Sequence, residues 1–389
     1  MKLFSRLFTA PERSFFLFGP RGTGKSTLIT TRYPNSLRID LLRPETLRGF
    51  LARPESLAEL VYGNPDKSVI VIDEVQKAPS LLSVVHQLIE ERRGLQFILT
   101  GSSARKLKRS SADLLGGRAL KRMLHPFMAA ELNNYFSLEH ALQNGMLPLI
   151  YGEKDPQDIL HAYVNLYLHE EIQAEGLVRN LESFARFLEI VTFSHGSLLN
   201  ITNISRECAV KRKTVENYID ILEELLLARR LPIFSKRAQR ELSTHPKFYL
   251  FDAGVYYALR PKGSLDRPEE IEGAALEGLV AQHLFAWNDY STEKHSLGFW
   301  RTRAGAEVDF VVYGKKSFYA IEVKNAKRVS SQDTSTLETF LQDYSSAKAI
   351  LLYRGKEVIK IKNVLCMPCA DFLLQLKPNQ DVYLTSSPA

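Results

Sequence analysis

The chain has 389 residues, of which 45% are hydrophobic and 24% charged, and its formal net charge is +7. This length allows two or three domains with sizeable cores, and no apolar run approaches the roughly 20 residues of a membrane-spanning helix. The first residues carry charges and lack the apolar core of a signal peptide, so we expect a cytoplasmic protein without a membrane partner. The mild positive charge is compatible with nucleic acid or another anionic ligand but requires neither.

Up to about residue 150, short apolar runs alternate with amphipathic stretches, which predicts a parallel sheet covered by helices on both faces. The strands are expected at residues 14–18, 36–40, 69–72, 96–100 and 120–124. In a sheet of this kind, ligands bind beyond the carboxyl ends of the strands. The loops that follow these strands are therefore the first places to look for a site.

The loop after the first expected strand, residues 19–26, has the sequence GPRGTGKS, which fits the pattern G-x-x-x-x-G-K-S. Its glycines allow the backbone to curl so that N–H groups point at phosphate oxygens. In such a P-loop, Lys25 contacts the β- and γ-phosphates of a nucleotide and the Ser26 hydroxyl binds Mg²⁺. We therefore expect ATP and Mg²⁺ as cofactors; a glycine-rich turn that binds nothing is the alternative. The expected nucleotide-binding residues are Gly19, Pro20, Arg21, Gly22, Thr23, Gly24, Lys25, Ser26, Thr27 and Asp73.

Two acids, Asp73 and Glu74, end the third expected strand. Asp73 would hold Mg²⁺ through water beside the P-loop, and Glu74 would polarise the water that attacks the γ-phosphate. An ordinary strand that ends in solvated acids is the alternative. After the fourth strand, Ser102 is the first candidate and Thr100 the second for a residue that senses the γ-phosphate or the attacking water. A glycine–serine turn without a role is the alternative there.

Residues 115–119 read LGGRA, and LHPFMAAE follows at residues 124–131. Together with the P-loop, the two acids and the turn after the fourth strand, these residues resemble AAA+ ATPases, in particular a prokaryotic group that joins such a module to a long C-terminal region. The resemblance implies a homo-oligomeric ring, expected to be hexameric, with nucleotide at the subunit interfaces. It also implies an arginine that reaches the γ-phosphate of the neighbouring subunit. Arg118 is the candidate, and a surface arginine that caps a helix is the alternative. The expected catalytic residues are Glu74, Lys25, Arg118 and Ser102.

Helical periodicity dominates residues 151–250. Helices expected at residues 199–207 and 214–225 flank a basic turn, and a strand pair is expected between residues 231 and 250. Helix, turn, helix and two strands are typical of a winged helix, which contacts the DNA groove with the first residues of its second helix. The expected DNA-binding residues are Lys211, Arg212, Lys213 and Asn217, with Lys236, Arg237 and Arg240 as phosphate contacts on the wing. A protein-binding or nucleotide-sensing lid is the alternative.

From about residue 251 onward, the sequence predicts a second α/β region. A helix is expected at residues 269–287, a hairpin at 297–302 and 307–313, and a further strand at 318–323. The helix carries Glu277 and the hairpin carries Asp309. Because side chains alternate along a strand, Glu322 and Lys324 share one face, where Asp309 on the neighbouring strand can join them.

An acid on one strand followed by Glu-x-Lys on the next resembles the restriction-endonuclease-like fold with its PD-(D/E)XK pattern, although Val308 replaces the leading proline. The resemblance implies that Asp309 and Glu322 ligate Mg²⁺, that Lys324 orients the attacking hydroxide, and that Glu277 completes the site. A cross-strand salt bridge among surface residues is the alternative. Over the whole chain, the expected metal ligands are Ser26, Asp73, Glu277, Asp309 and Glu322.

The sequence therefore predicts an α/β protein with an AAA+ ATPase domain at residues 1–150, a helical and winged-helix domain at 151–250, and a restriction-endonuclease-like α/β domain at 251–389. The first functional hypothesis is a DNA-dependent ATPase of the helicase or branch-migration translocase type. It would act on branched or single-stranded DNA and hold or cut it with its C-terminal domain. The second is a signalling switch in which the P-loop gates a conformational change and the winged helix is a lid. In the third, the C-terminal region binds a protein effector.

Overall fold

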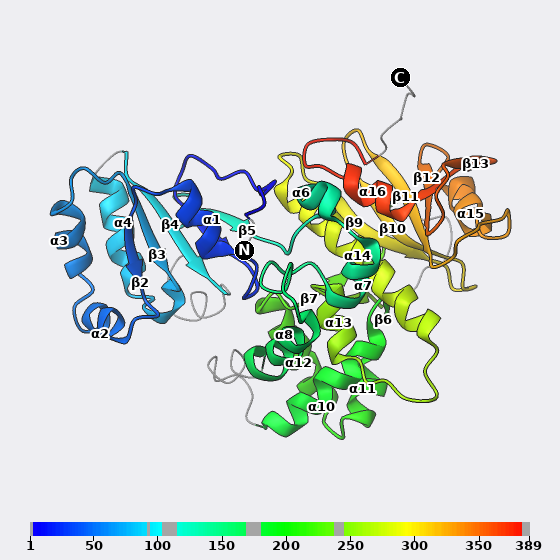
Figure 1. Ribbon diagram of the computed structural model, residues 1–389, viewed down its shortest axis with the longest axis horizontal. Helices are drawn as coiled ribbons and strands as arrows, with labels where there is room; N and C mark the ends of the chain where they lie inside the picture. Colours follow the sequence, from blue (N-terminus) through cyan, green and yellow to red (C-terminus); the bar gives the residue numbers. More distant parts are fainter. Residues whose placement is uncertain (1–2, 92–93, 103–114, 169–179, 237–244, 383–389) are drawn as a thin grey trace. The chain divides into compact units, whose positions relative to one another are not determined.

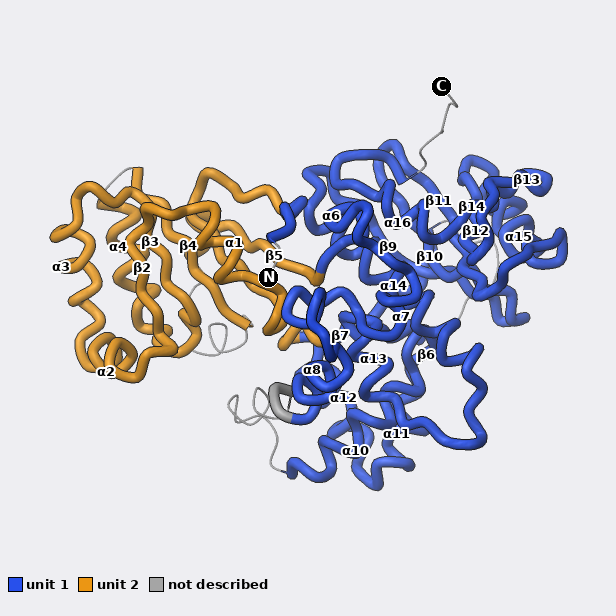
Figure 2. Tube along the Cα trace, viewed as in Figure 1, with its two compact units in different colours: residues 1–7, 127–223, 228–389 blue, residues 8–126, 224–227 orange. Residues whose placement is uncertain are grey.

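The structure, a computed structural model, describes residues 3–91, 94–102, 115–168, 180–236 and 245–382. The chain forms two compact units, which Figure 2 shows in different colours. The P-loop unit consists of residues 8–126 and 224–227, and the C-terminal unit of residues 1–7, 127–223 and 228–389. The domain boundaries expected at residues 150 and 250 do not coincide with this division, because helices between residues 127 and 150 pack on helices of the C-terminal unit.

Among the described residues, the P-loop unit forms a five-stranded parallel sheet in the order β2-β3-β4-β1-β5 (Figure 1). Its strands are β1 (Phe15–Phe18), β2 (Leu37–Asp40), β3 (Val69–Asp73), β4 (Gln96–Gly101) and β5 (Leu120–Met123). Its helices are α1 (Lys25–Arg32), α2 (Pro44–Ala52), α3 (Ser56–Tyr62) and α4 (Leu81–Glu91), with a 3₁₀ turn, η1 (Val75–Lys77), after β3. The predicted parallel sheet is confirmed, and each strand end lies within one residue of its expected position.

The order of the strands decides what can meet at their carboxyl ends. Strand β4 lies between β1, which leads into the P-loop, and β3, which ends in Asp73. A side chain at the end of β4 therefore lies between the P-loop and the acids. One face of the sheet packs against α4 and the preceding helices in a single apolar cluster, which includes Phe16, Phe18, Ile70, Ile72, Phe97, Leu99, Leu57, Val61, Val85 and Leu88. This core fixes the strands whose ends carry the site.

The first part of the C-terminal unit combines helices with an antiparallel sheet in the order β6-β8-β7. In chain order, its elements are α6 (Ala129–Leu132), η2 (Asn133–Tyr135), α7 (Leu138–Asn144), α8 (Pro156–Ala162), the π-helical segment η3 (Tyr163–Leu168), α10 (Leu181–Val191), η4 (Thr192–Ser194), β6 (Ser197–Leu198), α11 (Ile201–Glu207), α12 (Arg212–Glu224), β7 (Ala228–Leu231), β8 (Lys247–Leu250) and α13 (Ala253–Leu259).

Both helices of the expected helix–turn–helix are present, but the second begins at Arg212, so two of the three basic residues lie in its first turn. The strand expected to open at residue 231 instead ends there. Pro232 has no N–H with which to continue the ladder, and Ile233 forms a parallel bridge with Phe299 of another sheet. Chain segments from the two expected C-terminal domains thus contact each other within one unit.

The last part of the unit contains a long helix followed by a six-stranded mixed sheet in the order β13-β14-β12-β11-β10-β9. Its elements are α14 (Pro268–Tyr290), β9 (Ser296–Arg301), β10 (Glu307–Tyr313), β11 (Phe318–Lys324), α15 (Ser335–Asp343), β12 (Lys348–Tyr353), β13 (Ile359–Ile361), β14 (Val364–Pro368) and α16 (Cys369–Gln375). Strands β9, β10 and β11 form an antiparallel meander, and β12 runs parallel to β11. The expected helix, hairpin and following strand are confirmed.

Helix α14 is the central element of this unit, and it contacts α7, α13, β8 and β11. Between Gly278 and Trp287 every residue of α14 except Phe285 is buried, as expected for a helix enclosed by other elements. Gly278 allows His195 to approach, because a Cβ atom at this position would collide with the imidazole ring. The His195 ring stacks on Tyr256 with 4.2 Å between ring centroids, and its Nδ1 accepts a hydrogen bond of 3.0 Å from the N–H of Leu250.

None of the helices in the described residues combines the length and the hydropathy that a membrane span requires.

We expect Gly278→Ala to lower the free energy of unfolding by about 1–3 kcal/mol, because the added methyl group overpacks the contact with His195. Gly273→Ala is the matched control on the same helix. There the nearest atom to a new Cβ, the Cβ of Asn325, lies 3.8 Å away, so the substitution should be neutral or stabilise the helix by less than about 1 kcal/mol. Urea unfolding followed by circular dichroism measures both. Equal effects of the two substitutions would show that α14 is not closely packed at Gly278.

Candidate functional site

The P-loop is folded around the side chain of Lys25. Gly22 and Gly24 have φ angles of 82° and 84°, in the left-handed region that favours glycine. The ammonium Nζ of Lys25 donates hydrogen bonds to the carbonyl oxygens of Gly19, at 2.6 Å, and Pro20, at 3.1 Å. The fully buried Thr23 also donates its hydroxyl to Pro20, at 2.9 Å. The loop therefore holds the ammonium inside its own curl, where a P-loop lysine meets phosphate oxygens.

The carboxylate of Asp73 joins three elements at the edge of the sheet. Its Oδ2 accepts a hydrogen bond of 3.1 Å from the Ser26 hydroxyl on α1, and its Oδ1 accepts one from the Thr100 hydroxyl on β4. The backbone N–H of Glu74 lies 3.3 Å from the same Thr100 hydroxyl. A serine hydroxyl and a carboxylate at this distance are the oxygen donors that Mg²⁺ prefers beside a nucleotide. The residues present therefore fit a nucleotide-bound Mg²⁺ ion.

Glu74 is held by a residue that the sequence analysis did not identify. The backbone of Glu74 has a φ of 60°. The residue that holds it is Gln76, whose Nε2 donates a hydrogen bond of 2.6 Å to Oε2 of Glu74. The same Nε2 lies 3.3 Å from the Ser102 hydroxyl, and both Gln76 and Ser102 are buried. Ser102, the first candidate for the sensor, thus contacts Gln76, whereas Thr100, the second, contacts Asp73 and the N–H of Glu74. The polar spacing Asp-Glu-x-Gln is the only trace of this role in the sequence.

Arg118 lies in the P-loop unit, two residues before β5. Its guanidinium forms an ion pair with Glu90 on α4, and the Arg118 side chain is 37% exposed. This pair lowers the pKa of the Glu90 carboxyl. Because both partners face solvent, the pair contributes little to stability and can exchange for another anion.

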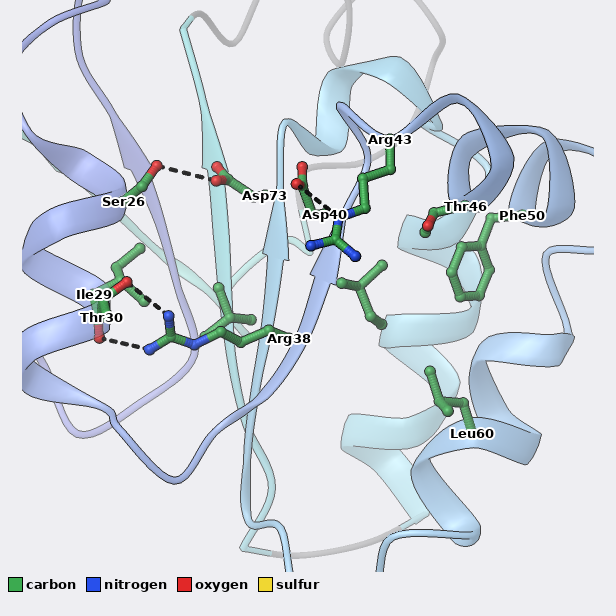
Figure 3. Close-up of a pocket in the computed structure, with 12 residues that line it drawn as sticks. Ser26, Ile29, Thr30, Arg38, Asp40, Arg43, Thr46, Phe50, Leu60 and Asp73 are labelled. Atoms are coloured by element: carbon green, nitrogen blue, oxygen red, sulfur yellow. Dashed lines mark hydrogen bonds and ion pairs between the residues drawn. The ribbon is translucent and has the colours of Figure 1, made fainter.

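A cavity of about 390 Å³ opens beside Ser26 and Asp73 (Figure 3). One wall is apolar and includes Ile39, Phe50 and Leu60, while polar side chains from α1, β2, α2 and β3 line the rest. Arg38 is fixed there by hydrogen bonds to the Thr30 hydroxyl and the Ile29 carbonyl oxygen, as Figure 3 shows. This volume lies within the usual range for sites that bind small molecules.

The basic residues expected to bind DNA lie at the beginning of α12. Lys211, Arg212, Lys213 and Asn217 are exposed, whereas Val215, Tyr218, Ile219 and Leu222 on the opposite face are buried. Lys236 is also exposed, and its ammonium lies 4.3 Å from the centroid of the Tyr313 ring. Arg237 and Arg240 lie outside the described residues. The structure thus brings the four expected residues together on one exposed helix end.

The four residues expected in the nuclease-like site also lie together. The register of β10 and β11 places Asp309 opposite Glu322, and Oδ2 of Asp309 accepts a hydrogen bond of 2.9 Å from the N–H of Val323. Lys324 Nζ lies 2.8 Å from Glu322 Oε1. Glu277 approaches from α14, where its Oε1 accepts a hydrogen bond of 2.6 Å from the Tyr249 hydroxyl. Sequence reasoning identified all four positions but not what stands between them.

Lys247 on β8 stands at the centre of this group, and it is 1% exposed. Its Nζ lies 2.9 Å from Glu277 Oε1, 2.6 Å from Glu307 Oε1 and 2.9 Å from Asp309 Oδ1. Neither Lys247 nor Glu307 was among the expected site residues. Within the described ranges, no three His, Cys, Asp or Glu side chains are arranged to hold a metal ion. With an ammonium at its centre, this group does not fit the Mg²⁺ ion implied by the resemblance.

The acids of this group outnumber the positive charges near them. Burial, together with the charge of Asp309, raises the pKa of Glu277 to about 7 and that of Glu322 to about 8. Burial by itself lowers the pKa of Lys247, but Asp309, Tyr249, Glu277 and Glu307 raise it well above its usual value. The lysine therefore remains an ammonium ion inside the protein.

Three family models match consecutive parts of the chain. Residues 11–133 match an AAA domain, residues 135–266 a domain of unknown function (DUF8612), and residues 272–372 a second domain of unknown function (DUF4143). The first match contains the P-loop, Asp73, Glu74 and Thr100. It supports an AAA-type ATPase. The five-stranded parallel sheet of the P-loop unit is consistent with this assignment.

The chain is also similar to proteins without an assigned function. An uncharacterized protein of Haemophilus influenzae is 20% identical over 340 residues, which cover 82% of this chain and 80% of that protein. An uncharacterized protein of Methanocaldococcus jannaschii is 24% identical over 272 residues, 63% of this chain and 58% of that protein. Among solved structures, the replication initiator DnaA bound to AMPPCP and single-stranded DNA aligns with 56% of this chain and 84% of its own, at a TM-score of 0.27 and 14% identity. These similarities do not assign a function to the chain.

We expect Thr100→Val to reduce ATP turnover by about 10- to 100-fold, the rate equivalent of one hydrogen bond to a charged group. Valine preserves the shape of threonine but has no hydroxyl to form hydrogen bonds with the carboxylate of Asp73 and the backbone N–H of Glu74. Ser102→Ala is the matched control, because it removes a neighbouring hydroxyl that contacts Gln76, and its effect should be smaller. Phosphate release at saturating MgATP measures both. A larger loss in Ser102→Ala than in Thr100→Val would return the sensor role to Ser102.

Proposed function

We propose that the chain is an ATP-hydrolysing protein that processes DNA, a DNA-dependent ATPase of the helicase or branch-migration translocase type. The observation that carries the proposal is the convergence of Lys25, Ser26, Asp73 and Thr100 at the carboxyl ends of neighbouring strands. Lys25 binds the β- and γ-phosphates, Ser26 and Asp73 hold Mg²⁺, and Glu74 polarises the attacking water. A Mg²⁺ ion held by Ser26 and Asp73 would supply positive charge against the charge that develops on the transferred phosphoryl group.

The proposal includes a homo-oligomeric ring, hexameric by resemblance, in which Arg118 reaches the γ-phosphate of the neighbouring subunit. The exposure of Arg118 supports this role, since an arginine that acts across an interface must be accessible in the separate subunit. Its partner Glu90 is exposed as well, so the ion pair can be given up at low cost when an anionic phosphate is offered.

The DNA contact is proposed for the exposed end of α12. The order α10-β6-α11-α12-β7-β8, with β8 central in its sheet, supports a winged helix. Positive side chains in the first turn of a helix oppose its macrodipole and so cost stability. Arg212 and Lys213, which lie in this turn, are therefore not explained by the stability of α12, whereas phosphate contacts would account for them and for the preceding Lys211.

The C-terminal domain is proposed to have a restriction-endonuclease-like core. The order α14-β9-β10-β11-α15-β12 supports this, with an antiparallel meander followed by a parallel strand. The ammonium of Lys247 among the acids favours binding without cleavage. This observation also favours the second candidate function, a P-loop switch whose C-terminal domain binds DNA or protein without cutting.

ATP turnover with and without DNA separates the two candidates. A DNA motor should hydrolyse ATP faster when duplex, single-stranded or branched DNA is added, and a switch should not respond to any of them. Turnover that is absent under all conditions would contradict the proposed ATPase.

Replacing Lys211, Arg212 and Lys213 together by alanine should weaken duplex binding and flatten its dependence on salt. Each lost phosphate contact removes about 0.9 from the slope of log affinity against log salt concentration. The matched control replaces three exposed lysines of the same unit, Lys315, Lys316 and Lys360, and should leave the slope unchanged. Fluorescence anisotropy at several salt concentrations measures both proteins. An unchanged slope in the first variant would mean that this end of α12 faces a protein.

A further inference from the structure

We propose that Lys247 is the resident cation of the acidic group formed by Glu277, Glu307, Asp309 and Glu322, and that it excludes a divalent metal ion from that group. The ammonium occupies the position between α14 and β10 that a metal would need in order to bridge Glu277 and Asp309. In this conformation, the wild-type chain therefore does not bind Mg²⁺ or Mn²⁺ there. All five residues belong to the C-terminal unit, whereas Lys25, Ser26 and Asp73 belong to the P-loop unit.

Strand β8 inserts two side chains from one face. Lys247 and Tyr249 are two residues apart, so they point to the same side of the strand. The ammonium of Lys247 and the hydroxyl of Tyr249 both contact Oε1 of Glu277, at 2.9 Å and 2.6 Å. Through Lys247, β8 also contacts Asp309 and Glu307 on β10. The antiparallel sheet of β6, β7 and β8 is thus joined by its central strand to the acids of the six-stranded sheet.

The positive charges of this group are distributed among the acids. Lys247 contacts Glu277, Glu307 and Asp309. Lys324 pairs with Glu322 at 2.8 Å, and Arg301 pairs with the second oxygen of Glu307 at 2.6 Å. Each carboxylate therefore already has a cation that belongs to the chain. A buried ammonium with several carboxylate partners is satisfied in the way that buried charges require.

A divalent ion and this ammonium cannot share the same carboxylates. Mg²⁺ binds carboxylate oxygens at about 2.0–2.1 Å, and an ammonium ion within the same ligand set would repel it at close range. Exchange of one cation for the other therefore requires Lys247 to leave. Because Lys247 belongs to β8, metal binding and the present position of β8 exclude each other.

One atom indicates that the group could accept another cation if Lys247 were removed. Glu322 Oε2 is buried, and no hydrogen-bond partner for it exists among the residues that the structure describes. Glu322 lies opposite Asp309 in the sheet. If Lys247 were removed, Oδ1 of Asp309 would lose its hydrogen bond to the ammonium. A metal ion between Asp309 and Glu322 could be coordinated by both oxygens.

The test uses the full chain, freed of metal by a chelator, with Mn²⁺ as the probe. Binding is measured by electron paramagnetic resonance and its effect on stability by thermal unfolding. As a single substitution, Asp309→Asn should change neither the Mn²⁺ affinity of the protein nor the shift in melting temperature that Mn²⁺ causes. Lys247→Met should melt at a lower temperature than wild type and gain at least about tenfold in Mn²⁺ affinity, because a close like charge has been removed. Adding Asp309→Asn to Lys247→Met should abolish this gain.

Two further variants serve as controls. Lys247→Arg keeps the positive charge and should gain no Mn²⁺ affinity. Lys360→Ala removes an exposed lysine from the same sheet and should behave as wild type. The proposal is overturned if wild-type protein binds Mn²⁺ through Asp309, or if a folded Lys247→Met chain gains no Mn²⁺ affinity. Should Lys247→Met fail to fold, the wild-type protein decides: Mn²⁺ binding that is lost in Asp309→Asn contradicts the proposal, and its absence supports it.

Discussion

The hydrogen bonds from Ser26 and Thr100 to the carboxylate of Asp73 are the interactions on which the nucleotide site depends. They connect the helix after the P-loop with the ends of two neighbouring strands. The parallel sheet makes this possible, because β4 lies between the P-loop strand and the strand that carries the acids. A change in strand order would separate these groups by the width of a strand, about 4.8 Å, and leave no ligand set for Mg²⁺. The fold thus supplies the geometry, and three short polar side chains supply the chemistry.

The C-terminal unit is organised around a different constraint, the need of buried charges for partners. Four carboxylates meet near α14 and β10, and Lys247, Lys324 and Arg301 neutralise most of their charge. Without partners, these acids would be costly to bury. Because three of them pair with Lys247, the pairs also restrict where β8 can lie. At the centre of the four acids stands the ammonium of Lys247.

The sequence predicted the local features well, because they depend on short-range patterns. The strands of the P-loop unit, the helix pair around residues 211–213 and the meander that carries Asp309 all follow from hydrophobic periodicity and from glycine and proline positions. The convergence of Asp309, Glu322 and Lys324 could be predicted because side chains alternate along a strand. The candidates Lys25, Ser26 and Asp73 were identified because one short motif and one strand end define them.

What the sequence could not predict depends on distant contacts. Lys247 lies 62 residues from Asp309 and belongs to a strand that sequence reasoning assigned to another domain. No local pattern distinguishes this lysine from a solvated one. Gln76 was missed because its role arises from the turn at Glu74 and from the close approach of Gly101, not from its own neighbours. That Thr100 contacts Asp73 while Ser102 contacts Gln76 could not be predicted either, because both contacts join residues far apart in the sequence.

The measurement that tests the central claim most directly is a comparison of MgATP affinity and turnover in wild-type protein and the Glu74→Gln variant. Glutamine keeps the shape of glutamate but cannot polarise water, so the account predicts that affinity is retained and that turnover falls by at least about 10²-fold. Lys25→Ala, which removes the charge that meets the phosphates, should lose turnover as well. Turnover of Glu74→Gln at the wild-type rate would contradict the account, because the residue that polarises the attacking water would then lie elsewhere.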